Sequence, residues 1–336
     1  MRDCLRRIRL GVLTALVGLC LILLPAVASA AELNAALARL FTGENPPSSV
    51  AELRSMQEHL QKLSETLVPC TVGVRVGPAQ GSSVIISEDG YVLTAAHVVM
   101  KPNTDVTFVL HDGRIVKGKT LGMNRTIDAG LMKITDEGKY PFVEMGDSKT
   151  VREGQWCVAT GHPGGYEKGR TPVVRFGRVL QNHESVITSD CTLVGGDSGG
   201  PLFDMQGRVI GINSRIAGPL NANMHVPVNT YRETWDRLAA ADAWGSMPGN
   251  APFFGVQGEQ DSTKPRIAKV FDGTPAEEAG IKVGDLILSF DGQPVDEFAT
   301  LSKLVGDKQP GDKVKVRLRR GNDELELTVT IGRRSE

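Results

Sequence analysis

The sequence predicts a mainly β fold, with two groups of short antiparallel strands in its central part and a smaller domain after them. Three observations predict it. The chain has 336 residues, of which 40% are apolar and 23% charged, which is the composition of a folded globular protein. It contains 38 glycines and 18 prolines, which indicate many turns. Its apolar segments are mostly shorter than ten residues, as in strands rather than in a helix bundle.

The first 30 residues have the layout of a secretory signal peptide. Four arginines precede an uncharged apolar run, and the run ends in the small residues Ala-Ser-Ala at 28–30. This run is nearly long enough to span a bilayer, so an uncleaved N-terminal anchor is the alternative. We expect the remainder to be exported to the periplasm or another extracytoplasmic space. The formal net charge of −1 gives no reason to expect a nucleic acid partner.

Three cysteines stand outside this N-terminal segment, and each lies among apolar residues. We expect Cys70, Cys157 and Cys191 to be buried free thiols, because a chain of this size builds its core without disulfides. A disulfide between Cys157 and Cys191 is the alternative. No group of Cys and His residues has the spacing of metal ligands, and the sequence implies no metal, nucleotide or organic cofactor.

A helical segment is expected at 31–69, between the signal segment and the first strand. Its main helix begins with Ser49 and Glu52 in the spacing of a capping box. The apolar residues of this helix recur every three or four positions and form one apolar face. The face packs either on the chain's own barrel or on copies of itself in an oligomer. The residues of this stripe are Val50, Leu53, Met56, Leu60, Leu63 and Leu67.

From residue 71 onwards the period of the apolar residues changes to two, in short runs separated by turns such as Glu-Asp-Gly at 88–90. Such runs are typical of antiparallel hairpins. About a dozen short strands in two groups fit a pair of β-barrels. A helix at 229–240 and a stretch rich in glycine and proline follow, which indicates a domain boundary. Strands are predicted at 71–76, 83–87, 91–94, 106–110 and 115–121, and then at 156–160, 173–180, 185–188, 201–203 and 208–213.

The segment Gly-Gly-Asp-Ser-Gly-Gly-Pro at 195–201 is the most informative motif. Glycines on both sides of a serine let a substrate backbone approach and let neighbouring amides point to one place. The amides of Gly196 and Ser198 would then form an oxyanion hole, while Ser198 attacks a carbonyl carbon. A glycine-rich turn is a weak signal in itself, so a general base has to be found elsewhere in the sequence.

A histidine and an aspartate lie at the ends of two other apolar segments. His97 follows a strand through the small residues at 94–96 and is the candidate general base. Asp128 stands just before another apolar strand and would fix the tautomer of His97. The chain order His97, Asp128, Ser198 is that of the chymotrypsin-type triad, and it differs from the subtilisin and α/β-hydrolase orders. These three residues are the predicted catalytic residues.

With these motifs the sequence resembles the HtrA/Deg family of exported serine proteases, which carry a trypsin-like protease domain followed by one or more PDZ domains. The segments at 81–91 and 211–213 extend the resemblance around the three motifs. It implies a chymotrypsin-like double β-barrel protease domain at 70–242, a linker at 243–252 and a small α+β PDZ domain at 253–333.

Two positions depart from the usual pattern of this family. Asp197 stands where the family usually has asparagine, and Ser83 where it usually has glycine. In digestive trypsin-like enzymes the aspartate before the serine is paired by a new N-terminal amine after zymogen cleavage. No comparable cleavage site is apparent in this sequence, so we expect Asp197 to have another partner.

The resemblance also implies substrate and peptide sites. Cleavage after Lys or Arg resembles a site with an aspartate six residues before the nucleophile, and Thr192 stands there. Leu193 and Ile216 would line the primary pocket and favour a small or medium-sized apolar residue. In the PDZ domain a Phe-Phe-Gly-Val turn would hold a peptide carboxylate, beside an apolar groove. The predicted peptide-binding residues are Phe253, Phe254, Gly255, Val256, Phe298 and Leu301.

The function implied by the resemblance is that of an ATP-independent serine endopeptidase that degrades unfolded or damaged proteins, in protein quality control and stress response. The family also implies a homotrimer assembled through the N-terminal part of the protease domain. C-terminal peptides would bind the PDZ domain, and a membrane would be contacted only if the signal segment stays uncleaved. The alternative is a PDZ-dependent binding or chaperone protein with weak or absent proteolysis.

Overall fold

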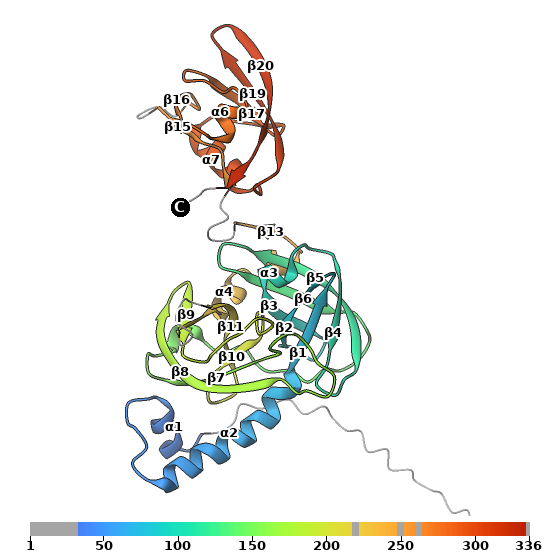
Figure 1. The fold of residues 1–336 in the computed structure, drawn as a ribbon. Coiled ribbons are helices and arrows are strands. Elements are labelled where there is room, and N and C mark those ends of the chain that lie inside the picture. The colour runs from blue at the N-terminus through green and yellow to red at the C-terminus, as the bar shows by residue number, and fades with distance from the viewer. Residues whose placement is uncertain (1–32, 217–221, 247–251, 260–263, 334–336) are drawn as a thin grey trace, which may run out of the picture.

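The computed structural model describes residues 33–216, 222–246, 252–259 and 264–333. Two β-barrels lie side by side, a long N-terminal helix runs beneath the second of them, and a smaller C-terminal domain follows (Figure 1). The predicted mainly β fold is thereby confirmed. The predicted signal segment at 1–30 lies outside the described residues. Within the described ranges, no helix combines the length and apolar character that crossing a membrane requires.

Two helices precede the barrels, namely α1 (Ala35–Phe41) and α2 (Val50–Cys70). The hydroxyl of Ser49 caps α2 by accepting a hydrogen bond from the backbone N–H of Glu52. The Glu52 carboxylate accepts from the backbone N–H and the hydroxyl of Ser48. The predicted capping box is therefore present in a modified form, since its return bond goes to the residue before the cap.

The apolar stripe of α2 has a buried part and an exposed part. Met56, Leu63 and Leu67 are buried in a core cluster that continues into the second barrel. Val50 and Leu53, at the start of the helix, are 67% and 52% exposed. The stripe thus packs on the chain's own barrel over most of its length and leaves its N-terminal end open.

The first barrel consists of six antiparallel strands in the order β5-β4-β1-β2-β3-β6, and pairing between β5 and β6 closes it. Its interior is a separate core cluster in which valines from several strands meet Phe108 and Met132. The short helix α3 (Ala96–Val99) follows β3 directly. The strands are β1 (Thr71–Val76), β2 (Ala79–Ile85), β3 (Tyr91–Ala95), β4 (Asp105–Val109), β5 (Ile115–Asn124) and β6 (Ala129–Ile134).

The second barrel is closed in the order β10-β11-β12-β9-β8-β7. A 3₁₀ turn, η1 (Ser148–Thr150), precedes it. The alternating pattern did not predict β12, whose five residues Asn-Met-His-Val-Pro are mostly buried on both sides. The strands are β7 (Trp156–Gly161), β8 (Val173–His183), β9 (Val186–Ser189), β10 (Pro201–Phe203), β11 (Val209–Ile216) and β12 (Asn223–Pro227).

The helix predicted at 229–240 is interrupted. It forms as α4 (Val228–Glu233) and α5 (Trp235–Ala239), with Thr234 between them. Thr234 has φ −114° and ψ 17°, and its hydroxyl donates to the carbonyl of Thr230. Such a side-chain bond competes with the regular helix ladder. The following strand β13 (Ala243–Trp244), inside the predicted linker, pairs in parallel with β5.

The C-terminal domain has its own core and a four-stranded sheet in the order β18-β17-β19-β20. Arg320 forms two hydrogen bonds to the fully buried carboxylate of Asp285. The elements are β14 (Pro252–Phe253), β15 (Val256–Gly258), β16 (Ile267–Val270), α6 (Pro275–Glu278), β17 (Leu286–Phe290), β18 (Gln293–Pro294), α7 (Phe298–Gly306), β19 (Lys313–Arg320), β20 (Asp323–Thr330) and β21 (Gly332–Arg333).

All three cysteines of the described part are buried free thiols, as predicted. Cys157 on β7 lies opposite Gly177 on β8, and Cys191 packs against the same glycine. The sulfur atoms of Cys157 and Cys191 are 3.8 Å apart, which is a contact rather than a bond. Burial raises the pKa of the Cys70 thiol to about 12, so this thiol is also unreactive at neutral pH.

We predict that a protein comprising residues 31–336 shows no rapidly reactive thiol in its native state and three after unfolding in guanidinium chloride. Burial excludes the reagent from the native thiols, and unfolding exposes them. The measurement is titration with a thiol-specific chromogenic disulfide. A count of one thiol after unfolding would instead indicate a disulfide between Cys157 and Cys191.

Candidate active site

His97 lies in α3, two residues after the end of β3. Its ring nitrogen Nδ1 is 2.9 Å from Oδ2 and 3.1 Å from Oδ1 of Asp128. The backbone N–H of His97 donates to Oδ1 of the same carboxylate at 3.0 Å. Because a carboxylate only accepts hydrogen bonds, Nδ1 carries the ring proton and Nε2 is left as a base. The predicted pairing of His97 with Asp128 is present.

Asp128 is held by more than the histidine. Its side chain is buried, and Ser214 on β11 donates its hydroxyl proton to Oδ2 at 2.6 Å. Its backbone has φ +64°, in the left-handed region, at a cost of about 1 kcal/mol for a residue with a Cβ. The bonds to His97 and Ser214 offset this cost. Ser214 was not predicted, because nothing in its local sequence distinguishes it from other strand residues.

Ser198 lies in the loop between β9 and β10, and its backbone is fixed from both barrels. Its carbonyl accepts a hydrogen bond from the N–H of Ser82 on β2 at 2.8 Å. The next residue, Gly199, donates its N–H to the carbonyl of Asn213 on β11 at 2.7 Å. These bonds lie along the seam, which is the line where the two barrels meet. They hold the candidate nucleophile against the end of β3. Among the hydrogen bonds of the described residues, none joins the Ser198 hydroxyl to His97.

The predicted oxyanion hole is built around Gly196. Gly196 has φ +95°, and a Cβ there would come within 2.5 Å of the His162 carbonyl, so only glycine fits. Its carbonyl accepts from the Ser82 hydroxyl at 2.8 Å, and the Gly195 carbonyl accepts from the N–H of Gly164 at 2.6 Å. Within the described residues, the backbone N–H groups of Gly196 and Ser198 donate no hydrogen bond. Both are therefore available to a ligand.

Asp197 has a partner, as expected from the sequence, and this partner is Arg175. Its carboxylate is fully buried and lies 2.9 Å from Nη2 and 3.2 Å from Nη1 of Arg175 on β8. The backbone N–H of Val194 also donates to it at 2.9 Å. Burial raises the pKa of Asp197, and Val194 and Arg175 act in the opposite direction. Arg175 is 22 residues away in sequence, so local pattern could not indicate the pair.

Ser83, the second departure, is a buried residue of β2 whose hydroxyl has no hydrogen-bond partner among the described residues. Its neighbour Ser82 makes the contacts to the active-site loop. The hydroxyl of Ser82 accepts from the N–H of His162 and donates to Gly196. Ser83 therefore contributes no bond to the site.

The loop from His162 to Arg170 lies against the candidate oxyanion hole. The guanidinium of Arg170 donates to the carbonyls of Pro163 and Gly165, which closes the loop on itself. Burial lowers the pKa of His162 to about 4, and the nearby Arg170 acts in the same direction. The ring of His162 is therefore neutral at physiological pH and contacts Tyr166.

The two residues proposed for the primary pocket lie in different surroundings. Leu193 is buried in the core cluster of the second barrel, where it belongs with Cys191 and Leu202. Ile216 is 46% exposed at the end of β11. Their role in substrate binding remains a prediction.

The C-terminal domain contains an apolar groove of about 210 Å³ between its first turn and α7. All six residues predicted for peptide binding line it. In the described residues, β15 pairs only with β16, so its other edge is open to a further strand. The lining residues are Pro252, Phe253, Phe254, Gly255, Val256, Phe298, Leu301, Ser302 and Val305.

Comparisons with known proteins agree with this arrangement. Residues 81–212 match the model of the trypsin-like peptidase domain, and residues 252–331 match that of the PDZ domain. The fold and the site thus define a trypsin-like peptidase domain followed by a PDZ domain.

Two curated relatives are named as serine endoproteases. The "Probable periplasmic serine endoprotease DegP-like" of Halomonas elongata is 34% identical over 75% of this chain and 56% of its own length. The protein of that name from Hahella chejuensis is 33% identical over 77% of this chain and 58% of its own length. The chain therefore spans little more than half the length of these relatives. It belongs to the HtrA/Deg family.

A solved structure shows the same fold. The serine endoprotease from Yersinia pestis has a TM-score of 0.50 and 24% identity, and the match covers 87% of this chain and 100% of that one.

We predict that Asp128→Asn lowers kcat for unfolded casein by about 10⁴-fold at neutral pH, because an amide no longer fixes the Nδ1–H tautomer of His97. Asp112→Asn, in an exposed hairpin, is the control and should leave kcat unchanged. Fluorescence release from labelled casein measures both. A loss of less than tenfold in Asp128→Asn would contradict the role assigned to Asp128.

Proposed function

We propose that this protein is an exported, ATP-independent serine endopeptidase that cleaves unfolded or damaged proteins in the periplasm. The observation that carries the proposal is the hydrogen-bonded pair of His97 and Asp128 on one barrel, together with a serine loop whose backbone is hydrogen-bonded to both barrels. The names of the curated relatives support the endoprotease activity and the compartment. The proposed catalytic domain extends over 70–242, the linker over 243–252 and the PDZ domain over 253–333.

The proposed reaction proceeds through an acyl-enzyme. Ser198 Oγ attacks the carbonyl carbon of the scissile peptide bond while His97 Nε2 takes its proton, and Asp128 stabilises the imidazolium. The N–H groups of Gly196 and Ser198 bind the oxyanion, at about 3–4 kcal/mol for each donor. His97 then gives the proton to the leaving amine. A water molecule activated by His97 finally hydrolyses the ester bond to Ser198.

We propose a preference for a small or medium-sized apolar residue before the scissile bond. Thr192 provides no negative charge that would bind Lys or Arg. Ile216, which is half exposed at the end of β11, offers apolar surface beside the active-site seam. Leu193 is proposed as the base of this pocket.

The proposed partner of the PDZ domain is a peptide C-terminus. The free edge of β15 can add the peptide as a further strand, and the groove beside α7 can bury an apolar side chain. Gly255 has φ +91° in the turn that leads to β15, where its N–H would face the terminal carboxylate. Such binding either activates the protease domain or delivers substrates to it.

A homotrimer is the proposed assembly. The start of α2 exposes Val50 and Leu53, and beside Leu53 lies an apolar groove of about 350 Å³ that reaches Trp156 and Phe176 of the second barrel. Apolar surface of this kind is usually covered by another chain in the assembled protein.

We predict that Leu53→Glu converts the trimer into monomers, because a charge placed in this apolar groove cannot be covered by another copy. Light scattering at micromolar concentration measures the mass. Ile115→Glu, at an apolar position on β5 that is more exposed than Leu53, should keep the wild-type mass. A monomeric wild-type protein would remove the proposed assembly.

Asp197 and Ser83 are the two sequence features that favour the alternative, a PDZ-dependent binding or chaperone protein with weak or absent proteolysis. Since Arg175 pairs Asp197, the first of these reasons no longer favours it. The second is a hydroxyl that makes no bond to the site. The endopeptidase is therefore the function that the geometry supports best.

The deciding experiment is hydrolysis of unfolded casein by residues 31–336, beside Ser198→Ala, with and without a peptide that ends in a free apolar carboxylate. We expect cleavage by the wild-type protein and none by the variant. Acceleration by the peptide, and none by the same peptide with an amidated C-terminus, would show that the PDZ domain acts as a switch. Peptide binding without cleavage by either protein would support the binding-protein alternative.

A further inference from the structure

Asp197 is a buried carboxylate in the loop that carries the proposed oxyanion hole. It stands between Gly196 and Ser198, whose N–H groups form the proposed oxyanion hole. Its side chain is fully buried, so water cannot solvate the carboxylate. A buried carboxylate without a cation either takes up a proton or moves towards water.

Movement of the Asp197 side chain would also move the backbone around it. The N–H of Asp197 donates to the carbonyl of Val194, and its carboxylate accepts from the N–H of the same residue, so these bonds close a turn over 194–197 that contains the N–H of Gly196 and ends directly before that of Ser198. Its carbonyl also accepts from the side-chain amide of Asn213 and from the N–H of Gly200. A shift of the Asp197 side chain therefore displaces the N–H groups that flank it.

The cation that prevents this shift comes from a different element. Arg175 lies on β8 opposite Ala159 of β7, in a regular part of the second barrel. Its guanidinium meets both carboxylate oxygens of Asp197, and its side chain is only 16% exposed. The other nearby cation, Arg170, donates instead to the carbonyls of Pro163 and Gly165. Within the described residues, Arg175 is thus the cation that contacts Asp197.

We propose that Arg175 is a positioning residue. By pairing with Asp197 from its place on a barrel strand, it holds the N–H groups of the proposed oxyanion hole in position. This proposal rests on the proposed endopeptidase function. The rigid two-bond geometry between a guanidinium and a carboxylate fixes the direction of the Asp197 side chain as well as its charge. The loop therefore reaches its catalytic shape without cleavage of the chain to release a new amine.

The test is a double-mutant cycle on the active protein. Arg175→Met keeps the length of the side chain but leaves Asp197 unpaired, and we expect kcat to fall about 100-fold with KM within about threefold. Adding Asp197→Asn removes the unpaired charge and keeps an acceptor for the N–H of Val194. We expect the double variant to recover to within about tenfold of the wild-type kcat. The substrate is a fluorogenic peptide taken from a mapped casein cleavage site.

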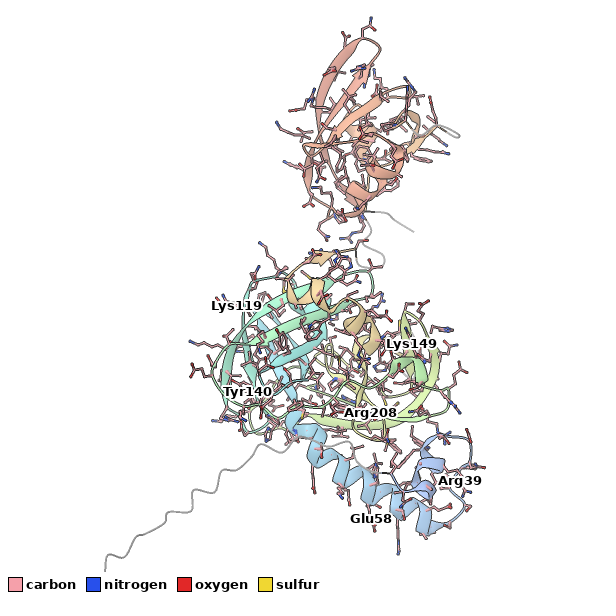
Figure 2. The ribbon with its side chains drawn as sticks, turned by 180° about the vertical axis from the view of Figure 1, so that it is seen from behind. Arg39, Glu58, Lys119, Tyr140, Lys149 and Arg208 are labelled. Atoms are coloured by element: carbon pink, nitrogen blue, oxygen red, sulfur yellow. The ribbon has the colours of Figure 1, made fainter. Side chains whose placement is uncertain are left out.

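A matched control separates this role from general stability. Arg208→Met breaks another ion pair of the second barrel, in which Arg208 binds the buried Asp204 in a groove beside α1. Figure 2 labels Arg208. The substitution should lower the melting temperature while leaving kcat unchanged. A kcat of Arg175→Met equal to that of this control would overturn the proposal, as would a double variant as slow as the single one.

Two further measurements deal with a variant that does not fold and with an inactive wild-type protein. If Arg175→Met does not fold, Arg175→Lys carries the test, since an ammonium group makes one bond instead of two and should lower kcat about tenfold. A wild-type kcat in Arg175→Lys would overturn the proposal. The wild-type protein is assayed first, with casein and a serine-reactive fluorophosphonate probe. Its complete inactivity would overturn the proposed function itself, whereas an active wild type with an equally active Arg175→Met overturns this inference alone.

Discussion

The active site depends on the seam between the two barrels. Ser82 on the first barrel and Asn213 on the second both hydrogen-bond to the backbone at 198–200, which lies between them. The same seam joins Ser214 of the second barrel to the buried Asp128 of the first. Neither barrel alone holds the nucleophile and the base in register. The proposed chemistry therefore requires the packing of two barrels, each closed by its own strand pairing.

The second constraint is that each buried carboxylate needs hydrogen-bond or ion-pair partners. Two carboxylates of the candidate site, those of Asp128 and Asp197, are buried, and each has different hydrogen-bond partners. Asp128 is bound by the ring of His97 and the hydroxyl of Ser214, which leaves the charge free to stabilise an imidazolium. Asp197 is neutralised by Arg175, which gives it a structural role in the loop. In the proposed mechanism one carboxylate thus serves proton transfer, and the other fixes the shape of the loop.

Much of this could be predicted from the sequence, because the fold class depends on the period of the apolar residues and on turn residues. The candidate catalytic residues also stand in short, recognisable motifs. What could not be predicted are contacts between residues distant in sequence. Ser82, Ser214 and Arg175 each reach the site from a strand, and nothing in the neighbouring sequence indicates the distant residue that each one contacts. The break at Thr234 also escaped prediction, since a side-chain bond to the backbone overrides an otherwise regular helical pattern.

The most direct test of the central claim is a crystal structure of the protein with a peptidyl boronic acid that ends in an apolar residue. The account predicts a covalent bond between boron and Ser198 Oγ. It also predicts one boronate oxygen within hydrogen-bond distance of the N–H groups of both Gly196 and Ser198, with His97 still bound to Asp128. A boronate that forms no bond to Ser198, or whose oxygens avoid both N–H groups, would contradict the account.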